Sequence, residues 1–260
     1  MCQSDKEKYI LLSKLNAYKK KVKNAIETTK TVLQESKNPS LSFSGGKDSV
    51  VLLDIAVEAG FNGKLVFFKY GICDDIETPK ENIDILKYYA EKHGLRYDIL
   101  ECLGEVDCWE QCGRFILVPE TKEEKTIFNK TNYDYAKKYA EYEKENGIDL
   151  GIIGMRKAES KNRRIVLSMK GPIYKTKTRE SITCCPLLNF SNADIWAYIF
   201  SNNLKYLSIY DYKYIDRERN RNEITMLYND GIIRNGAIFH YVNMYPDFFS
   251  WLRQRWGVNF

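Results

Sequence analysis

Hydrophobic positions along this chain follow two alternating spacings, which predict strands separated by helices. Short runs rich in branched or aromatic side chains are typical of buried strands, whereas apolar residues that recur every three or four positions are typical of helices. The predicted strands are 41–44, 64–69, 96–101, 149–154 and 182–187. The predicted helices are 9–37, a run that begins at Ser49, 79–93, 133–146 and a run capped by Ser191.

This order of elements predicts the α/β fold class. Strands that alternate with helices, at spacings long enough for crossover connections, form a Rossmann-like, mostly parallel sheet with helices on both faces. We divide the chain into an N-terminal helix at 1–38, an α/β domain at 39–204 and a mainly helical C-terminal appendage at 205–260, which is rich in Arg, Asn and aromatic residues. We expect the appendage to pack on the sheet and to close the site.

A glycine loop lies at the first predicted strand-to-helix junction. Residues 42–50 read SFSGGKDSV, so an apolar run ends in polar residues and two glycines before a helix begins. Glycines permit a sharp turn and a close approach to a ligand, and the N–H groups of a helix start attract anions. The alternative is a glycine turn capped by polar residues. We expect a pyrophosphate group to bind to Ser42, Ser44, Gly45, Gly46, Lys47, Asp48 and Ser49.

A second cluster of polar residues follows the fourth predicted strand. Residues 154–164 read GMRKAESKNRR, in which Arg156, Ser160 and Arg163 can share one side of a helical turn. Guanidinium groups match the oxygens of phosphate or sulfate. Since the carboxyl ends of parallel strands face one crevice, we expect this cluster, with Gly154, to lie beside the glycine loop. The alternative is a basic helix face exposed to solvent.

Composition sets the broad class of the protein. The 260 residues carry a net charge of +5, which is mild, and basic residues cluster between 156 and 179. No apolar run is long enough to cross a bilayer, and the N-terminus lacks the apolar core of a secretion signal. We therefore expect a cytoplasmic protein without a membrane partner.

The cysteines argue against a disulfide framework, because there are seven of them in a chain without a secretion signal. No CxxC pair occurs. Thiolates can hold an iron–sulfur cluster, but the spacings here match no common pattern, and buried structural thiols are the favoured interpretation. The cysteines that lie close in sequence are Cys102, Cys108 and Cys112, and the adjacent pair Cys184 and Cys185.

Three blocks of sequence together resemble the 3′-phosphoadenosine 5′-phosphosulfate (PAPS) reductase family. The first is SGGKDS at 44–49, the signature of PP-loop ATP pyrophosphatases, and the second is a G-x-R-x-x-E-S-x-x-R pattern at 154–163. The third, at 186–199, is similar to the family's PL-x-x-W-x-x-x-D-I-W-x-Y-I segment, with Phe190 in place of the first tryptophan. Residues 209–211 also resemble the family's PLYD turn. The resemblance covers residues 40–212 and implies the adenine nucleotide α-hydrolase-like fold.

This resemblance implies an enzyme that binds ATP with magnesium, cleaves it to AMP and pyrophosphate, and adenylates an acceptor. Candidate magnesium ligands are Asp48 and Asp74, although a solvated acidic turn explains Asp74 equally well. The glycine loop, Gly154 and Ser160 would contact the nucleotide. The implied catalytic residues are Lys47, Asp48, Arg156 and Arg163.

The acceptor is left open by the sequence. It would carry phosphate or sulfate, and nucleic acids and small molecules both qualify. Sulfur transfer through Cys184 or an external persulfide is one purpose that such an adenylate could serve. A homodimer is compatible with the sequence.

Two other functions are retained as alternatives. One is a PAPS reductase-type oxidoreductase that binds sulfonucleotides, but those enzymes resemble one another in a C-terminal cysteine that attacks sulfur, and this chain has no cysteine after Cys185. The other is a module that senses nucleotides without turnover, which the intact Lys47 and Asp48 disfavour.

Overall fold

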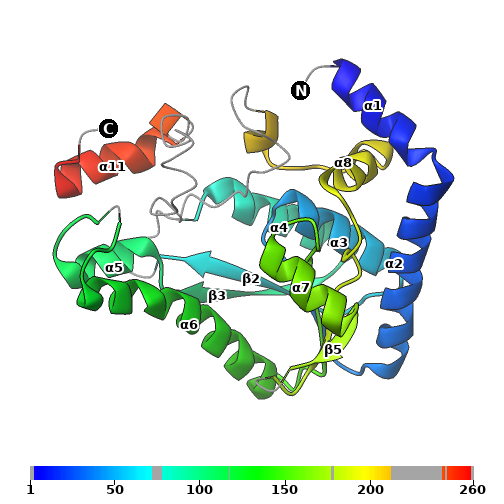
Figure 1. The fold of residues 1–260 in the computed structure, drawn as a ribbon, viewed down its shortest axis with the longest axis horizontal. Coiled ribbons are helices and arrows are strands. Elements are labelled where there is room, and N and C mark those ends of the chain that lie inside the picture. Colours follow the sequence, from blue (N-terminus) through cyan, green and yellow to red (C-terminus); the bar gives the residue numbers. More distant parts are fainter. Residues whose placement is uncertain are drawn as a thin grey trace.

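A six-stranded sheet forms the centre of the computed structural model (Figure 1). The structure describes residues 3–71, 78–116, 118–176, 179–211, 242–243 and 245–258. The strand order is β3-β2-β1-β4-β6-β5, and every neighbouring pair is parallel except β5 with β6. The predicted α/β class is therefore confirmed. The strands are β1 (Pro39–Ser42), β2 (Lys64–Tyr70), β3 (Arg96–Cys102), β4 (Leu150–Ile152), β5 (Ile173–Lys175) and β6 (Ile182–Cys184).

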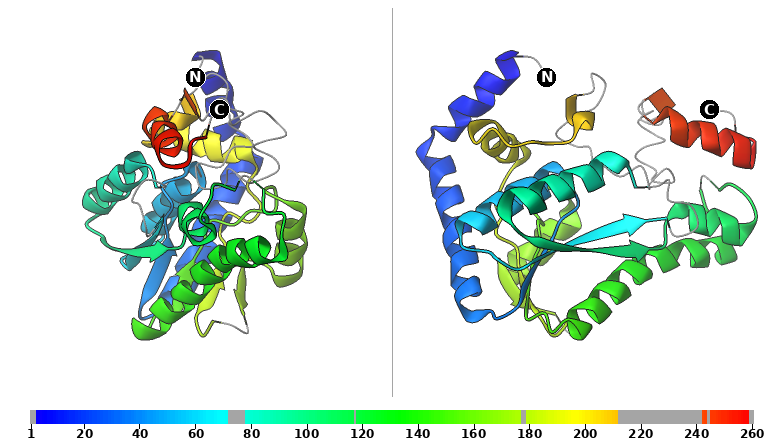
Figure 2. Two further views of the ribbon diagram at one scale, coloured as in Figure 1. Left: turned by 90° about the vertical axis from the view of Figure 1, so that its left-hand side faces the viewer. Right: turned by 180° about the vertical axis from the view of Figure 1, so that it is seen from behind.

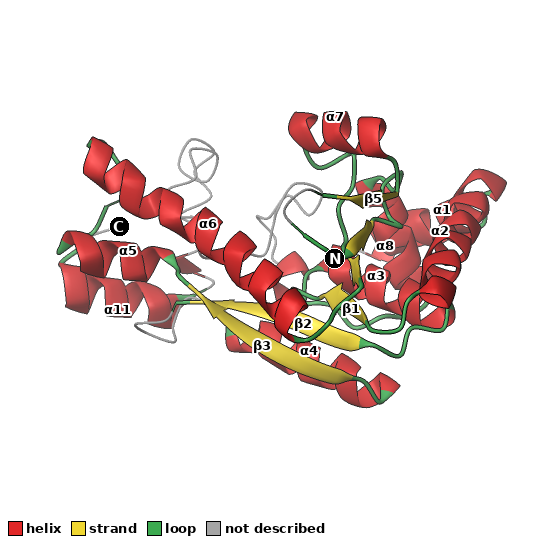
Figure 3. Cartoon of the chain, turned by 90° about the horizontal axis from the view of Figure 1, so that it is seen from below, coloured by secondary structure: helices red, strands yellow, loops and turns green. Residues whose placement is uncertain are grey.

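Helices cover both faces of the sheet, and α4 and α6 lie on opposite faces of β2 and β3 (Figure 3). The helices are α1 (Gln3–Ser13), α2 (Asn16–Glu35), α3 (Lys47–Glu58), α4 (Lys80–His93), α5 (Glu105–Cys112), α6 (Lys122–Glu145), α7 (Lys161–Lys170), α8 (Asn192–Ser201), the short 3₁₀ helix η1 (Ser208–Asp211) and α11 (Pro246–Trp256).

Side chains of β2 pack into two apolar layers. Leu65 and Phe67 belong to the main core, which also contains Leu86 of α4. Val66 faces the other way and packs in a separate cluster with Tyr139 of α6. Successive residues of a strand point to opposite faces, so a strand covered on both sides needs an unbroken apolar run. The sequence KLVFFK supplies that run.

The two terminal parts of the chain lie at opposite ends of the molecule (Figure 2). At one end, α1 packs on α8 and α2 packs on α3. The prediction of one helix over 9–37 is wrong, because the chain turns between Ser13 and Asn16 and forms two helices. At the other end, Phe249 of α11 is buried in a cluster with Trp109 of α5 and Phe128 of α6. The proposed domain boundaries stay predictions.

Further elements differ from the sequence-based expectation. The hydrophobic spacing predicts none of α5, α7 and β5, and it places the first strand at 41–44 instead of Pro39–Ser42 and the start of α6 at 133 instead of Lys122. Thr121 and Glu124 form a capping box at that start: the Glu124 N–H donates to the Thr121 hydroxyl at 3.1 Å, and the Thr121 N–H donates to the Glu124 carboxylate at 3.1 Å. Cap signals therefore locate this helix start better than apolar spacing does.

Candidate functional site

The two polar clusters predicted from the sequence meet at one edge of the sheet. From β1 the chain passes through α3 to β2 on one side, while β4 pairs with β1 on the other side, with Leu41 beside Ile152. The direction of strand order therefore reverses between β1 and β4. In open α/β sheets, such a reversal creates a crevice beyond the carboxyl ends of the strands. The segments 43–46 and 153–160 lie at these ends.

The glycine loop after β1 has the backbone geometry that its sequence requires. Gly45 has a φ of +76°, which favours glycine, and a Cβ there would lie 3.3 Å from the carbonyl oxygen of Asn82. The Asn82 side chain, from α4, donates to the carbonyl oxygen of Ser44 at 3.1 Å. Gly46 is the N-cap of α3, and the Ser49 hydroxyl donates back to its carbonyl oxygen at 2.8 Å. The loop is thus fixed by α4 on one side and by its own helix on the other.

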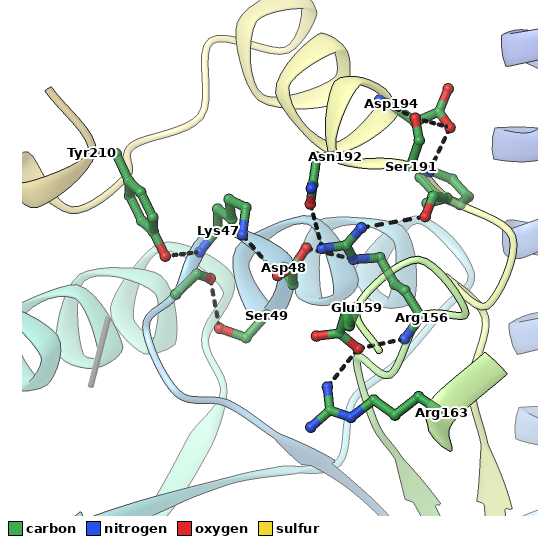
Figure 4. Close-up of polar contacts among 12 residues, drawn as sticks. Lys47, Asp48, Ser49, Arg156, Glu159, Arg163, Ser191, Asn192, Asp194 and Tyr210 are labelled. Carbon is green, nitrogen blue, oxygen red and sulfur yellow. Dashed lines mark hydrogen bonds and ion pairs between the residues drawn. The ribbon is translucent and has the colours of Figure 1, made fainter. Parts of the chain in front are cut away.

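Lys47 is buried at the start of α3, with 5% of its surface exposed. Its Nζ atom lies 3.2 Å from Oδ2 of Asp48 and 5.6 Å from the centroid of the Tyr210 ring. Its backbone N–H donates to the Tyr210 hydroxyl at 3.3 Å (Figure 4). The ammonium and the backbone N–H of this residue therefore both have partners within the protein.

Arg156 lies directly behind the loop and is 2% exposed. Its Nε atom is 2.8 Å from Oδ1 of Asp48, an ion pair whose N–H is not aligned with the oxygen. The two terminal nitrogens donate to the carbonyl oxygen of Phe190 at 3.3 Å and to the side-chain oxygen of Asn192 at 2.7 Å. The guanidinium therefore joins the glycine loop to the start of α8 (Figure 4).

Glu159 connects Arg156 to Arg163. Its Oε2 atom accepts the backbone N–H of Arg156 at 2.8 Å and lies 2.5 Å from Nη1 of Arg163. Ser160 is the N-cap of α7, and its hydroxyl accepts the Arg163 N–H at 3.2 Å. The helix begins only at Lys161, so a turn precedes it and Arg156 does not share a helix face with Arg163. The Arg163 side chain, 32% exposed, is the more accessible of the two arginines.

The remaining predicted site residues are less closely grouped. The Ser42 hydroxyl donates to the Tyr139 hydroxyl at 3.1 Å, on the side of the sheet covered by α6. Gly154 packs against α3, where an added Cβ would lie 3.8 Å from backbone atoms of Asp48. Asp74 lies outside the described residues. The assignment of all these residues to a ligand stays a prediction.

Three residues of this region were not among the predicted site residues: Asn82, Asn192 and Tyr210. Tyr210 lies in the block at 209–211 that resembles a family turn, so the sequence pattern could have identified it as a site residue. The positions of Asn82 and Asn192 follow only from how α4 and α8 pack beside the loop.

Burial in the core keeps three cysteine thiols protonated. It raises the pKa of Cys102 to about 11 and the pKa values of Cys184 and Cys185 to about 12. Such thiols are protonated at neutral pH and are poor nucleophiles. Cys108 and Cys112 lie on α5, and Cys108 is buried beside Trp109. Within the described ranges, no three His, Cys, Asp or Glu side chains form a group that could hold a metal ion. The expectation that these cysteines are structural thiols and do not hold an iron–sulfur cluster stays a prediction.

Comparison with known sequences gives one family. The sequence profile of the phosphoadenosine phosphosulfate reductase domain matches residues 38–216, more than half of the chain. Sulfate adenylyltransferase subunit 2 proteins are similar as well. The protein from Marinobacter nauticus is 28% identical over 200 residues, which are 72% of this chain and 64% of that protein. The one from Aeromonas hydrophila is 27% identical over 218 residues, 79% of this chain and 69% of its own length. The chain therefore matches about two thirds of the length of these relatives.

Solved structures confirm the fold. A PAPS reductase from Candida auris, in a phosphate complex, superposes with a TM-score of 0.55 at 16% identity, covering 81% of this chain and 92% of that one. An NH₃-dependent NAD synthetase from Campylobacter jejuni reaches a TM-score of 0.50 at 16% identity, with 92% of each chain covered. Among the residues that the structure describes, no helix is long and apolar enough to span a bilayer.

Proposed function

Because this chain belongs to the phosphoadenosine phosphosulfate reductase domain family, we propose that it binds ATP at the Ser44–Ser49 loop and transfers AMP to an acceptor. One observation carries the proposal: the glycine loop after β1 and the Arg156–Arg163 segment after β4 flank a reversal of strand order. A crevice at such a position is where open α/β sheets bind their ligands. Its two walls carry lysine and arginine, as a polyphosphate requires.

The chemistry follows from the charges that develop. An acceptor oxygen attacks the α-phosphorus of ATP, the bond from that phosphorus to the bridging oxygen of the β-phosphate breaks, and pyrophosphate leaves with the negative charge. The N–H groups at the start of α3 and the Lys47 ammonium would stabilise this leaving group. Phosphoryl and nucleotidyl transfer depend mainly on such positioning and electrostatic stabilisation.

Arg163 would bind the second anionic group, the acceptor. Its guanidinium is held by Glu159 through one terminal nitrogen and is 32% exposed, so other N–H groups can reach a ligand. The names of the similar sulfate adenylyltransferase subunits support an oxyanion such as sulfate as the first acceptor to test. Arg156, by contrast, is buried and would act by fixing Asp48 rather than by touching the ligand.

The described residues do not form a magnesium site in this arrangement. Both carboxylate oxygens of Asp48 face cations, at 2.8 Å from Arg156 and 3.2 Å from Lys47, and Asp74 lies outside the described residues.

The test is pyrophosphate release from ATP, measured with and without sulfate. Wild-type protein should release pyrophosphate when an acceptor is present. Lys47→Ala should abolish this release and weaken ATP binding by roughly ten- to a hundredfold, because a charge-assisted contact contributes about 1.5–3 kcal/mol. Lys80→Ala is the matched control, since its side chain is 86% exposed and pairs with Asp84. Unchanged ATP affinity in a folded Lys47→Ala protein would refute the loop assignment.

A further inference from the structure

The Tyr210 hydroxyl lies at the start of α3, where the proposed function places a phosphate oxygen. It accepts the backbone N–H of Lys47 at 3.3 Å, and it would lie 3.4 Å from a Cβ added to Gly46. Figure 4 shows the ring reaching down to the loop from a segment far along the chain. The N–H groups of a helix start are the ones that an anion would use. One of them is already bonded to a phenol.

The ring also lies beside the buried Lys47 side chain. Tyr210 is itself 2% exposed, and its ring centroid is 5.6 Å from the Lys47 ammonium. Lys47 is 5% exposed, too little for a phosphate to reach it directly. For the lysine to meet an anion, a neighbouring group must move, and Tyr210 touches both the N–H and the ammonium.

A surface contact links η1 to α4. The Glu81 carboxylate accepts the backbone N–H of Ser208 at 2.7 Å and the Ser208 hydroxyl at 2.9 Å, and this contact is exposed. On its other side, the Tyr210 ring packs edge-on against Trp196 of α8, with centroids 5.3 Å apart. The Glu81–Ser208 contact is thus the exposed part of this arrangement, whereas Ile209 and Tyr210 belong to the main core.

We propose that Tyr210 covers the glycine loop as a neutral substitute for a phosphate oxygen and is displaced when the anion binds. This inference rests on the proposed function. A charged oxygen forms a hydrogen bond roughly twice as strong as a neutral one, so pyrophosphate would replace the phenol at the Lys47 N–H. Displacement opposes binding, which means that Tyr210 lowers the affinity of the loop and restricts it to strongly charged ligands.

Calorimetric titration with inorganic pyrophosphate, and separately with ATP, tests this inference. Tyr210→Phe keeps the ring and removes the competing hydroxyl, so both ligands should bind about two- to tenfold more tightly. Glu81→Ala should also tighten binding, because it releases η1. The matched controls are Tyr97→Phe, an exposed tyrosine near the amino end of β3, and Asp84→Ala on the exposed side of α4. Both controls should keep wild-type affinity.

Three outcomes would overturn the inference. Weaker binding by a folded Tyr210→Phe protein would mean that the hydroxyl binds the ligand, and equal binding would mean that it does not compete. In either case the proposed function stands, because the wild-type protein still binds ATP. If neither wild type nor Tyr210→Phe binds pyrophosphate or ATP, the proposed function falls together with the inference.

Discussion

The Nε atom of Arg156 lies 2.8 Å from Oδ1 of Asp48, which puts a buried guanidinium directly behind the glycine loop. The same side chain donates to Phe190 and Asn192 at the start of α8. A charge at 2% exposure is tolerated only when it is paired and hydrogen-bonded. The arginine therefore connects three segments that are far apart in sequence.

Arg156→Met should destabilise the fold. Removing one partner of a buried ion pair costs about 3–5 kcal/mol, because the other charge and the polar groups around it lose their partner. Urea denaturation of the variant measures this loss. Arg164→Met, on the exposed face of α7, is the control and should change the free energy of unfolding by less than about 0.5 kcal/mol. An Arg156→Met protein of wild-type stability that fails only in ATP binding would show instead that Arg156 contacts the ligand.

Arg163→Lys should impair pyrophosphate release almost as much as Arg163→Ala. An ammonium preserves the charge, but it lacks the planar set of N–H donors with which a guanidinium can bind Glu159 and an oxyanion at the same time. Rates measured over a range of sulfate and ATP concentrations give the loss for each substrate. Arg164→Lys, one position along the same helix, should retain wild-type rates. If Arg163→Lys also retained them, this cluster would be a solvated basic surface.

Gly151 and Gly154 should respond differently to alanine. A Cβ at Gly151 would clash with a terminal nitrogen of Arg179, which is ion-paired with buried Glu143. A Cβ at Gly154 would have 3.7 Å to its nearest neighbour, an ordinary contact. Gly151→Ala should lower the free energy of unfolding by about 1–3 kcal/mol, as overpacking does. Gly154→Ala should fold normally, and a loss of ATP binding in that folded protein would place Gly154 at the ligand.

Acidification should destabilise the protein partly through Asp149. Burial raises the pKa of its carboxyl, but hydrogen bonds from the Ser36 hydroxyl and from the N–H groups of Lys37 and Asn38 outweigh burial and hold the pKa below its usual value. A carboxyl whose pKa is lower in the folded state stabilises the fold above the unfolded pKa of about 3.9. This stability is lost as the pH falls through the folded value.

The measurement is urea denaturation between about pH 5 and about pH 2. Asp149→Asn should give a shallower fall of the unfolding free energy with pH than wild type. Asp84→Asn, in an exposed pair with Lys80, serves as the control and should retain the wild-type slope. A slope unchanged by Asp149→Asn would contradict the assigned role.

The sheet could be predicted from the sequence because its strands are buried on both faces. KLVFFK predicts β2 almost to its ends, and DLGIIG contains β4. The edge strand β5 carries exposed Ile173 and Lys175, so its pattern does not differ from that of a loop. Ser191 was predicted as a cap and is confirmed, since its hydroxyl accepts the Asp194 N–H at 3.1 Å.

The sequence predicts which residue types form the candidate site, but it does not predict which of these residues contact one another. The predicted order of strand, turn and helix is present because backbone geometry is encoded locally, by Gly45 and Gly46. The bounds differ from the prediction: β1 ends at Ser42 and α3 begins at Lys47, each two residues earlier than expected. The burial of Arg156 depends on Phe190 and Asn192, which come from a different part of the chain. Local sequence contains no information on such tertiary contacts.

The pairing of β1 with β4 has a consequence for the order of folding. Asn38, just before β1, and Asp149, just before β4, are 111 positions apart, and they make contact at the amino ends of the two paired strands whose carboxyl ends carry both walls of the crevice. During synthesis, the glycine loop therefore emerges long before the Arg156–Arg163 segment that forms the other wall. Contacts this distant in sequence form late, since chain entropy opposes them until the rest has collapsed. A ligand that needs both walls would bind only the completed domain, and by mass action it would protect the whole domain against unfolding and proteolysis.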